Sequence, residues 1–393
     1  MLIQEKVLQA KNLLREMNID CWITFVRESQ INGDPTLAFL VETDLTWHSA
    51  FVFTAAGEAH AIVGAYDQKS VEDLGAYDSV TGYVTGFKEP LLKLLQSFQP
   101  QQIALNFSES SEICDGITHG MYLTLKNSLR EVNMSDRIIS AEPLVSALRE
   151  RKSATELDYM KQAIHHTETI FEKVAGFISP GKTEKEIAAF MKNEVEKAGL
   201  ELAWEPAVCP AVFTGPETAG AHYAPTNRRV EPGHVLNMDF GVKVNGYCSD
   251  MQRTFYILKS GEQEAPLPVK KGFNTIVKAI EESRKTMRPG VAGREIDRVA
   301  RGIVTEAGYQ EFPHALGHQV GRYSHDGTAL LGPEWEKYAN KPHRPLENEM
   351  VFTLEPRLTV ENHGVVTIEE MAVVKQNGAE YMSRPQKELI LIR

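Results

Sequence analysis

Residues 235–258 read VLNMDFGVKVNGYCSDMQRTFYIL, and this stretch decides much of the fold. Two strand-like patterns flank Asn245-Gly246, the strongest short signal for a β-hairpin turn. A two-residue turn pairs Val244 with Tyr247, and that pair sets the register of both strands. The stretch therefore predicts two long antiparallel strands joined by a tight turn.

Alternation along these strands brings two aspartates to one face. The register sets Asp239 opposite Gln252 and Gly241 opposite Asp250, so the aspartates are diagonal neighbours, about 7–8 Å apart at the backbone. Gly241 leaves space between them. The opposite face is apolar and also needs burial, which favours a sheet covered on both sides over a solvated strand face. Two carboxylates buried in this way are costly unless a cation or a basic partner neutralises them, and we favour a metal site.

A second acidic hairpin lies in EMVFTLEPRLTVENHGVVTIEEMAVV, residues 349–374, with its turn predicted at 362–364. With a three-residue loop the paired numbers sum to 726, and Glu355 shares a face with Glu369. A two- or four-residue loop selects Glu370 instead. The proline after Glu355 cannot donate to the ladder and favours a bulge, so spacing alone leaves both choices open.

Three histidines lie between the hairpins, in FPHALGHQVGRYSHDG, residues 312–327. The spacing of His314 and His318 resembles that of a zincin helix, but Ala315 stands where that motif has its glutamate. The nearby glycines disfavour a helix, whereas a short strand would aim one imidazole inward. Together with His325, these residues indicate a metal or catalytic site beside the acidic hairpins.

An internal repeat accompanies the two hairpins. PGKTEKEIAAFMKNEVEKAGL begins at Pro180 and PGVAGREIDRVARGIVTEAGY begins at Pro289, an offset of 109 residues with 7 of 21 positions identical. Each copy reads as a turn, an amphipathic helix and a glycine at the carboxyl end. Because an acidic hairpin follows each copy, we expect a duplicated α+β domain whose pseudo-two-fold centre holds the site.

The first part of the chain has a different character. Helical spacing near the N-terminus is followed by strand patterns over 21–26, 49–57 and 58–66, a helix over 89–95 and a buried strand over 103–107. This alternation predicts a small α/β domain over residues 1–150, without an acidic–histidine cluster. A capping box in SATE then starts a long helix, which places the second domain at residues 152–393.

Composition excludes several classes of function. The 393 residues include 42 Lys and Arg against 53 Asp and Glu, a net charge of −11, and contain no basic run, which disfavours a nucleic-acid partner. No apolar run reaches the ~18–20 residues of a membrane span. The N-terminus lacks a signal-peptide layout, so we expect a cytoplasmic protein with its four scattered cysteines reduced.

These motifs, in this order, resemble a known family. Residues 152–393 resemble the pita-bread metallopeptidases, namely aminopeptidase P, prolidase and, more distantly, methionine aminopeptidase. The shared features are a histidine before the first hairpin, Asp-x10-Asp, the histidine in GHxxG, a histidine seven residues later, Glu-Pro, and Ile-Glu followed by an acid. The first 150 residues resemble the creatinase-type N-terminal domain. The resemblance implies an α+β pita-bread catalytic domain behind a smaller α/β domain.

The resemblance also implies a function. It predicts an exopeptidase that cleaves the Xaa-Pro bond of dipeptides or short peptides through a hydroxide bridging two divalent ions, with Mn²⁺ favoured and Zn²⁺, Co²⁺ or Fe²⁺ also suitable. It further implies a homodimer. The implied metal ligands are Asp239, Asp250, His318, Glu355 and Glu369.

The same resemblance implies roles for other side chains. Glu355 is the expected general base, and His222 (in GAHYAP) and His325 are expected to contact the scissile peptide. His314 matches a histidine on the substrate side. The pair Arg253 and Thr254 is expected to orient Asp250.

The sequence departs from the family pattern at two positions. Arg357 stands where the family has glycine after Glu-Pro, and Thr367 stands where it has an arginine two residues before the last ligand. Residues 327–346 also form a longer segment than usual, and Arg322, Arg344 and Arg357 are candidates to bind a substrate carboxylate. The alternatives are a creatinase-like hydrolase of another C–N bond and a non-catalytic binding module on the same fold.

Overall fold

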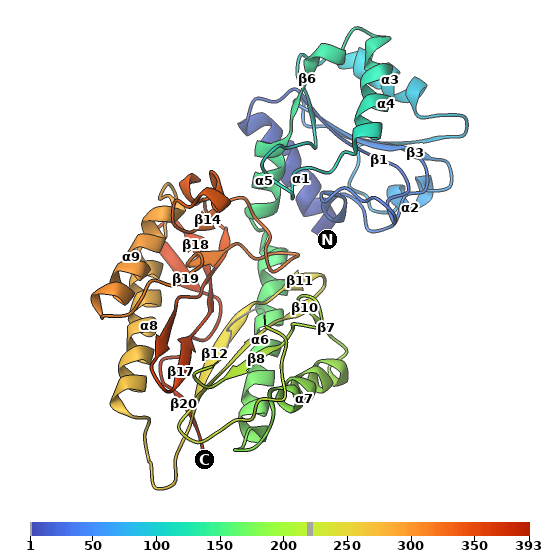
Figure 1. Ribbon diagram of the computed structural model, residues 1–393. Coiled ribbons are helices and arrows are strands. Elements are labelled where there is room, and N and C mark those ends of the chain that lie inside the picture. Colours follow the sequence, from blue (N-terminus) through green and yellow to red (C-terminus); the bar gives the residue numbers. More distant parts are fainter. Residues whose placement is uncertain (1, 218–222) are drawn as a thin grey trace. The chain divides into compact units, whose positions relative to one another are not determined.

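The computed structural model describes residues 2–217 and 223–393. The chain divides into two compact units, Met1–Arg149 and Glu150–Arg393 (Figure 1). In the described part of the chain, no helix has the length and apolar content that a membrane span requires.

The first unit is built on a six-stranded sheet in the order β4-β3-β2-β1-β5-β6, with β1 antiparallel to β2 and parallel to β5. Helices α1 and α5 supply side chains to the core on one face, and α3 and α4 to the core on the other. Its strands are β1 Cys21–Val26, β2 Ser49–Thr54, β3 Ala59–Gly64, β4 Ser79–Tyr83, β5 Ile103–Leu105 and β6 Ile138–Ser140. Its helices are α1 Leu2–Glu16, α2 Gln68–Glu72, α3 Lys88–Phe98, α4 His119–Arg130 and α5 Glu142–Glu150. The predicted α/β character is confirmed.

In its described residues the second unit contains four long helices and two groups of strands, which pair antiparallel except for the parallel pair β12–β20. The helices are α6 Ala154–Phe177, α7 Glu184–Lys197, α8 Leu267–Thr286 and α9 Gly293–Glu306. The first strands are β7 Glu201–Leu202, β8 Ala211–Thr214, β9 Val235–Phe240, β10 Val242–Val244, β11 Tyr247–Cys248 and β12 Met251–Ile257. The later strands are β13 Gly317–His318, β14 Leu330–Leu331, β15 Val351–Leu354, β16 Arg357–Val360, β17 Gly364–Thr367, β18 Glu370–Lys375, β19 Gly378–Tyr381 and β20 Ile390–Ile392.

The helices confirm the predicted duplication. Helix α9 begins and ends 109 residues after α7, and the ends of α6 and α8 show the same offset. Gly199 and Gly308, just past α7 and α9, have φ of 65° and 92°, the left-handed conformation that glycine adopts at helix ends. The predicted capping box at Ser153 and Glu156 starts α6. The two halves of this unit therefore repeat one helical plan.

Helices cover the outer side of each half of the strands. Helix α6 packs on β10 and β11 and α7 on β8, whereas α8 packs on β16, β17 and β19 and α9 on β14 (Figure 1). An apolar core joins α8 and α9 to β15–β19. Every residue of β9 and β12 is buried, as predicted for a sheet covered on both sides. The inner faces of the two hairpins are left to form the site.

Candidate metal centre

The first hairpin has the predicted register. Val244 pairs with Tyr247, and Asp239 pairs with Gln252. The ladder is interrupted between β9 and β10 at Gly241, where an added Cβ would lie 1.9 Å from the Ser249 carbonyl oxygen. Glycine is therefore required here for the close approach of the two strands, and not only to leave space between aspartates.

The second hairpin corrects the predicted register by one pair. Val360 pairs with Gly364, so the paired numbers sum to 724 and the loop comprises residues 361–363. The predicted loop at 362–364 was wrong, because Asn362 takes the left-handed conformation with φ of 64° and Gly364 already begins β17. A shift of two in the sum preserves alternation. Glu355 therefore lies level with Glu369, in the interruption that separates the β15–β18 ladder from the β16–β17 ladder.

The two hairpins meet at their interruptions. Gln252 and Glu369 form an isolated antiparallel bridge, and the Glu369 amide donates to the Gln252 carbonyl at 3.2 Å. The Gln252 side-chain amide also donates to Glu355 Oε2 at 3.3 Å. The sequence placed Gln252 on the acidic face but missed this role, since the contact joins segments more than a hundred residues apart.

The four predicted carboxylate ligands gather around the imidazole of the fifth, His318. His318 Nε2 lies 3.1 Å from Glu355 Oε1, 3.8 Å from Asp250 Oδ2 and 3.9 Å from Glu369 Oε1. One donor atom each from Asp250, His318 and Glu369 lie within 4.8 Å of one another. All five predicted ligands, Asp239 among them, line one small cavity of about 150 Å³.

The electrostatics of this cluster favour a cation. Burial and the neighbouring carboxylates raise the pKa of Asp239 and of Glu369 well above the ordinary range. Burial also raises the pKa of Asp250 to about 7. Burial opposes the charge on His318, but Glu355 and Asp250 outweigh it and raise the pKa of His318 to about 9.

Two of these carboxylates carry buried oxygens without a partner. Asp239 Oδ1 and Glu369 Oε2 accept no hydrogen bond from the described residues. A buried acceptor without a donor is costly, and a divalent cation supplies the missing charge and coordination. Four carboxylates and one imidazole form a donor set suited to Mn²⁺, Zn²⁺, Co²⁺ or Fe²⁺, so the residues present fit the implied ions.

The other predicted histidines have different placements. The ring of His325 lies 4.0 Å from that of His318, and His325 lines the small cavity. His314 Nδ1 is hydrogen-bonded with the Ala315 carbonyl at 2.8 Å, and burial lowers its pKa. His222 lies outside the described residues.

A larger cavity of about 370 Å³ adjoins the cluster. It shares His318, His325 and Glu355 with the small cavity and adds His314. Its apolar lining includes Phe213, Leu330 and Val365, and its cationic lining comprises Lys337, Lys341 and Arg357. Neither Arg322 nor Arg344 is among its lining residues. Of the three arginines that were candidates for a substrate carboxylate, Arg357 alone reaches this cavity within the described part of the chain.

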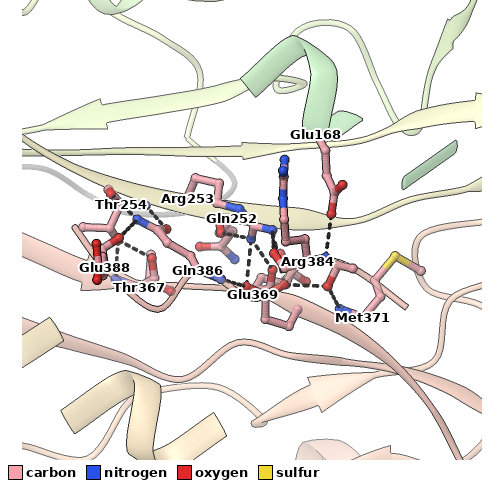
Figure 2. A network of polar contacts seen from close by, with 12 residues as sticks. Glu168, Gln252, Arg253, Thr254, Thr367, Glu369, Met371, Arg384, Gln386 and Glu388 are labelled. Carbon is pink, nitrogen blue, oxygen red and sulfur yellow. Dashed lines mark hydrogen bonds and ion pairs between the residues drawn. The ribbon is translucent and has the colours of Figure 1, made fainter. Parts of the chain in front are cut away.

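The predicted role of Arg253 and Thr254 in orienting Asp250 was wrong. Strand side chains alternate, so Arg253 projects from the face opposite Asp250. Its guanidinium donates to the carbonyl of Glu369 at 3.1 Å and pairs with the Glu370 carboxylate (Figure 2). Thr254 Oγ1 bonds with the Thr367 carbonyl and the Asn237 side chain. These residues secure the second hairpin behind the cluster.

The C-terminal segment reinforces the same support. The Gln386 side chain accepts from the Thr254 amide at 3.0 Å and donates to the Thr254 carbonyl at 2.7 Å (Figure 2). Its backbone amide donates to Glu370 Oε1 at 2.8 Å. Gln386 therefore pairs with β12 as a strand residue would.

A salt bridge on α9 holds the histidine segment. Arg301 binds Asp297 through two nitrogens, at 2.8 and 2.9 Å, and donates to the carbonyls of Phe312 and His314. Asp297 Oδ1 also accepts from the Leu316 amide at 3.1 Å. This pair was not predicted from the sequence, although its spacing of four residues on a predicted helix was a usable signal.

Comparison with known proteins agrees with this geometry. Residues 158–376 match the profile of metallopeptidase family M24. An uncharacterized peptidase of Staphylococcus epidermidis is 31% identical over 245 residues, which cover 62% of this chain and 65% of that protein. The match thus spans just under two thirds of that relative's length. An Xaa-Pro dipeptidase of Pyrococcus furiosus is 25% identical over 276 residues, covering 70% of this chain and 75% of the relative.

The fold is shared over nearly the whole chain. The crystal structure of an X-Pro aminopeptidase from Thermotoga maritima aligns with a TM-score of 0.73 and 24% identity, covering 97% of this chain and 100% of the other. The two-domain architecture, with an α/β sheet domain before a pita-bread domain, is therefore confirmed. Because the family profile covers more than half of the chain, this protein belongs to metallopeptidase family M24.

Proposed function

We propose that this chain is a dinuclear-metal-dependent exopeptidase that hydrolyses the Xaa-Pro bond of dipeptides or short peptides. The observation that carries the proposal is the buried cluster of four carboxylates around His318, which lies beside a cavity of about 370 Å³. Cavities of this size accommodate small ligands, which favours a short peptide over a protein substrate. The Xaa-Pro relatives lend support to the choice of bond.

We propose Asp239, Asp250, His318, Glu355 and Glu369 as the ligands of two divalent ions. When bound, such ions polarise the peptide carbonyl and lower the pKa of water enough to supply a nucleophile near neutral pH. Their positive charge would stabilise the ionised carboxylates, whose pKa values burial raises in the metal-free cluster. Manganese is the favoured ion.

Glu355 is the proposed general base. Although burial opposes its ionisation, the hydrogen bond and charge of His318 lower the pKa of Glu355, so its carboxylate is ionised at neutral pH. An ionised carboxylate that lines both cavities can accept a proton from attacking water and return it to the leaving nitrogen. Proton return matters for a proline amide, because its nitrogen is a poor leaving group until protonated.

The remaining histidines are proposed to act on the peptide. Burial lowers the pKa of His314, and the Nδ1–H of the neutral ring donates to the Ala315 carbonyl, so Nε2 can accept a hydrogen bond from an N–H group of the substrate. His325 lies against His318 at the junction of the two cavities, which suits stabilisation of the developing oxyanion. His222 is proposed as its partner.

The proposal is tested by metal content and peptide hydrolysis measured on the same preparation. We expect two equivalents of Mn²⁺ per chain and cleavage of Ala-Pro or a longer Xaa-Pro peptide, both lost on treatment with a chelator. Asp250→Ala should lose metal and activity, whereas a surface control, Arg298→Met on the exposed side of α9, should keep both. Stoichiometric metal without turnover of any Xaa-Pro peptide would contradict the proposal and favour a binding module.

A further inference from the structure

An arginine without a partner lines the larger cavity. Arg357 is half-buried at the start of β16, and the described residues offer it neither an ion pair nor a side-chain hydrogen bond. A guanidinium stays charged in proteins, and removing it from water without a partner carries a free-energy penalty. Binding of an anion to this guanidinium would offset the penalty.

The strand geometry aims this side chain at the cavity. Along β16, Leu358 and Val360 are buried and face α8, where Gly272 allows their close approach. Alternation sends Arg357 to the other face. Burial, with a smaller contribution from the Arg357 charge, lowers the pKa of His314, which lines the same cavity. The guanidinium therefore lies on the cavity side of the sheet.

The charges of the two cavities are separated. Carboxylates line the small cavity, whereas among the described lining residues of the larger cavity Glu355 is the sole carboxylate. Lys337, Lys341 and Arg357 line only the larger cavity. Phe213 and Val365, which pack together, give the larger cavity an apolar surface that suits an apolar ring. A ligand with an apolar body and one carboxylate matches this lining.

We propose that Arg357 binds the free carboxylate of the residue on the leaving side of the scissile bond, so that the enzyme prefers dipeptides over longer peptides. This inference rests on the proposed function, because it names the substrate class of that site. Arg357 is paired with Thr367 across the β16–β17 ladder. In this proposal, that residue pair of the second hairpin sets the preference for dipeptides. Substrates lacking that carboxylate leave the guanidinium unpaired.

The test measures binding before it measures catalysis. N-acetyl-L-proline presents the leaving-side residue with its carboxylate, and N-acetyl-L-prolinamide lacks that charge. Titration of each into the manganese-loaded protein should show that the acid binds roughly 10- to 100-fold more tightly, the scale of a charge-assisted hydrogen bond. Equal affinity for the acid and the amide would overturn the inference.

Variants assign the preference to one side chain. Arg357→Met keeps the length of the side chain and should remove the preference for the acid, whereas Arg357→Lys should retain part of it. Arg298→Met on α9 removes an exposed charge and should leave the preference unchanged. If Arg357→Met keeps the wild-type preference, Arg357 is not the anion site and the inference fails.

Kinetics separate this inference from the proposed function. For Ala-Pro against Ala-Pro-amide, Arg357→Met should raise KM for the acid by at least tenfold while changing kcat little and leaving the amide unaffected. If the wild type hydrolyses neither compound nor any other Xaa-Pro peptide, the proposed function is refuted. The binding experiment still decides the inference in that case. A double variant that exchanges the two paired residues, Arg357→Thr with Thr367→Arg, should recover part of the affinity for the acid that Arg357→Thr alone loses.

Discussion

Two adjacent glutamates should respond in opposite directions to the same substitution. Glu369 faces the acidic cluster, and Glu370 faces the Arg253 guanidinium on the other side of the strand. We predict that Glu369→Gln stabilises the metal-free protein and weakens its binding of metal. Glu370→Gln should instead destabilise the protein and leave the metal ligands in place.

The free energy at Glu369 can be bounded from the structure. A donor oxygen of Glu369 lies within 4.8 Å of one from Asp250, so their repulsion is at least about 3.5 kcal/mol at an effective dielectric of 20. Protonation relieves this repulsion. Holding a carboxyl proton at pH 8 costs at most about 5 kcal/mol relative to a free side chain, and about 2.3 kcal/mol at pH 6. The two protonation costs are upper limits on the stabilisation that Glu369→Gln can give at each pH.

The sign of the pH dependence follows from the raised pKa of Glu369, caused by burial and by the charges of Asp250 and Glu355. The folded state keeps a proton that the unfolded chain releases above about pH 4.3. Stability is therefore lost as pH rises from that value toward the folded-state pKa. Glu369→Gln removes this loss, so its advantage over the wild type should grow between pH 6 and pH 8.

Removing the charge of Glu370 has the opposite effect. The side chains of Arg253 and Glu370 are 7% and 1% exposed, and their closest nitrogen–oxygen distance is 3.1 Å. Breaking a buried pair by removing one partner costs about 3–5 kcal/mol. Glu370 also accepts from the Gln386 amide and from Ser383, so the C-terminal segment loses an anchor as well.

Thermal unfolding followed by circular dichroism in a chelator tests both predictions. At about 2–4 °C per kcal/mol, Glu369→Gln should raise Tm at pH 8 by up to roughly 10–20 °C, and Glu370→Gln should lower it by roughly 6–20 °C. Adding Mn²⁺ should raise Tm of the wild type and of Glu370→Gln, with a much smaller rise for Glu369→Gln. The reasoning is refuted if both substitutions shift the metal-free Tm in the same direction.

Three further substitutions test separate parts of the site. His325→Ala should retain bound metal while kcat falls by about 10²-fold, the scale of one oxyanion donor; unchanged turnover would exclude that role. Gly241→Ala should destabilise the protein by several kcal/mol in urea unfolding, because its Cβ would overlap the Ser249 carbonyl oxygen at 1.9 Å, and a Tm equal to wild type would contradict this. Arg301→Met should lower the free energy of unfolding by about 3–5 kcal/mol, because the Asp297 side chain, which is 2% exposed, loses its counter-charge. If Arg301→Lys is as stable as the wild type, the charge matters and the two-nitrogen geometry does not.

Local rules predicted the register of the first hairpin, although not the interruption of its ladder at Gly241. Asn245 and Gly246 both have positive φ, so the turn has a single register and alternation then assigns each side chain to a face. The second hairpin lacks such a turn, and its loop was misplaced by one residue. The error did not move Glu355 or Glu369 to the other face, because face depends only on whether the register sum is even or odd.

Contacts across the pseudo-two-fold centre were beyond these rules. The bridge between Gln252 and Glu369 joins the two hairpins, and neither strand alone carries a signal for the other. The same limit explains the error over Arg253. Strand alternation already places Arg253 on the face of the strand away from Asp250. Its partner is an acidic residue on the second hairpin, and only the packed structure shows which one.

Glu369 and Glu370, midway along the returning arm of the second hairpin, show how one segment both supplies a ligand to the cluster and supports the cluster from behind. Because adjacent residues face opposite sides, one carboxylate enters the cluster while the next is buried against Arg253 behind it. The cluster is costly without cations, and the supporting pair is stabilising only when intact. A segment that carries both carboxylates needs support from other parts of the chain. Gln386 and β20 give this support because both pair with β12. The C-terminal segment therefore contributes to the geometry of the site although it supplies none of the proposed ligands.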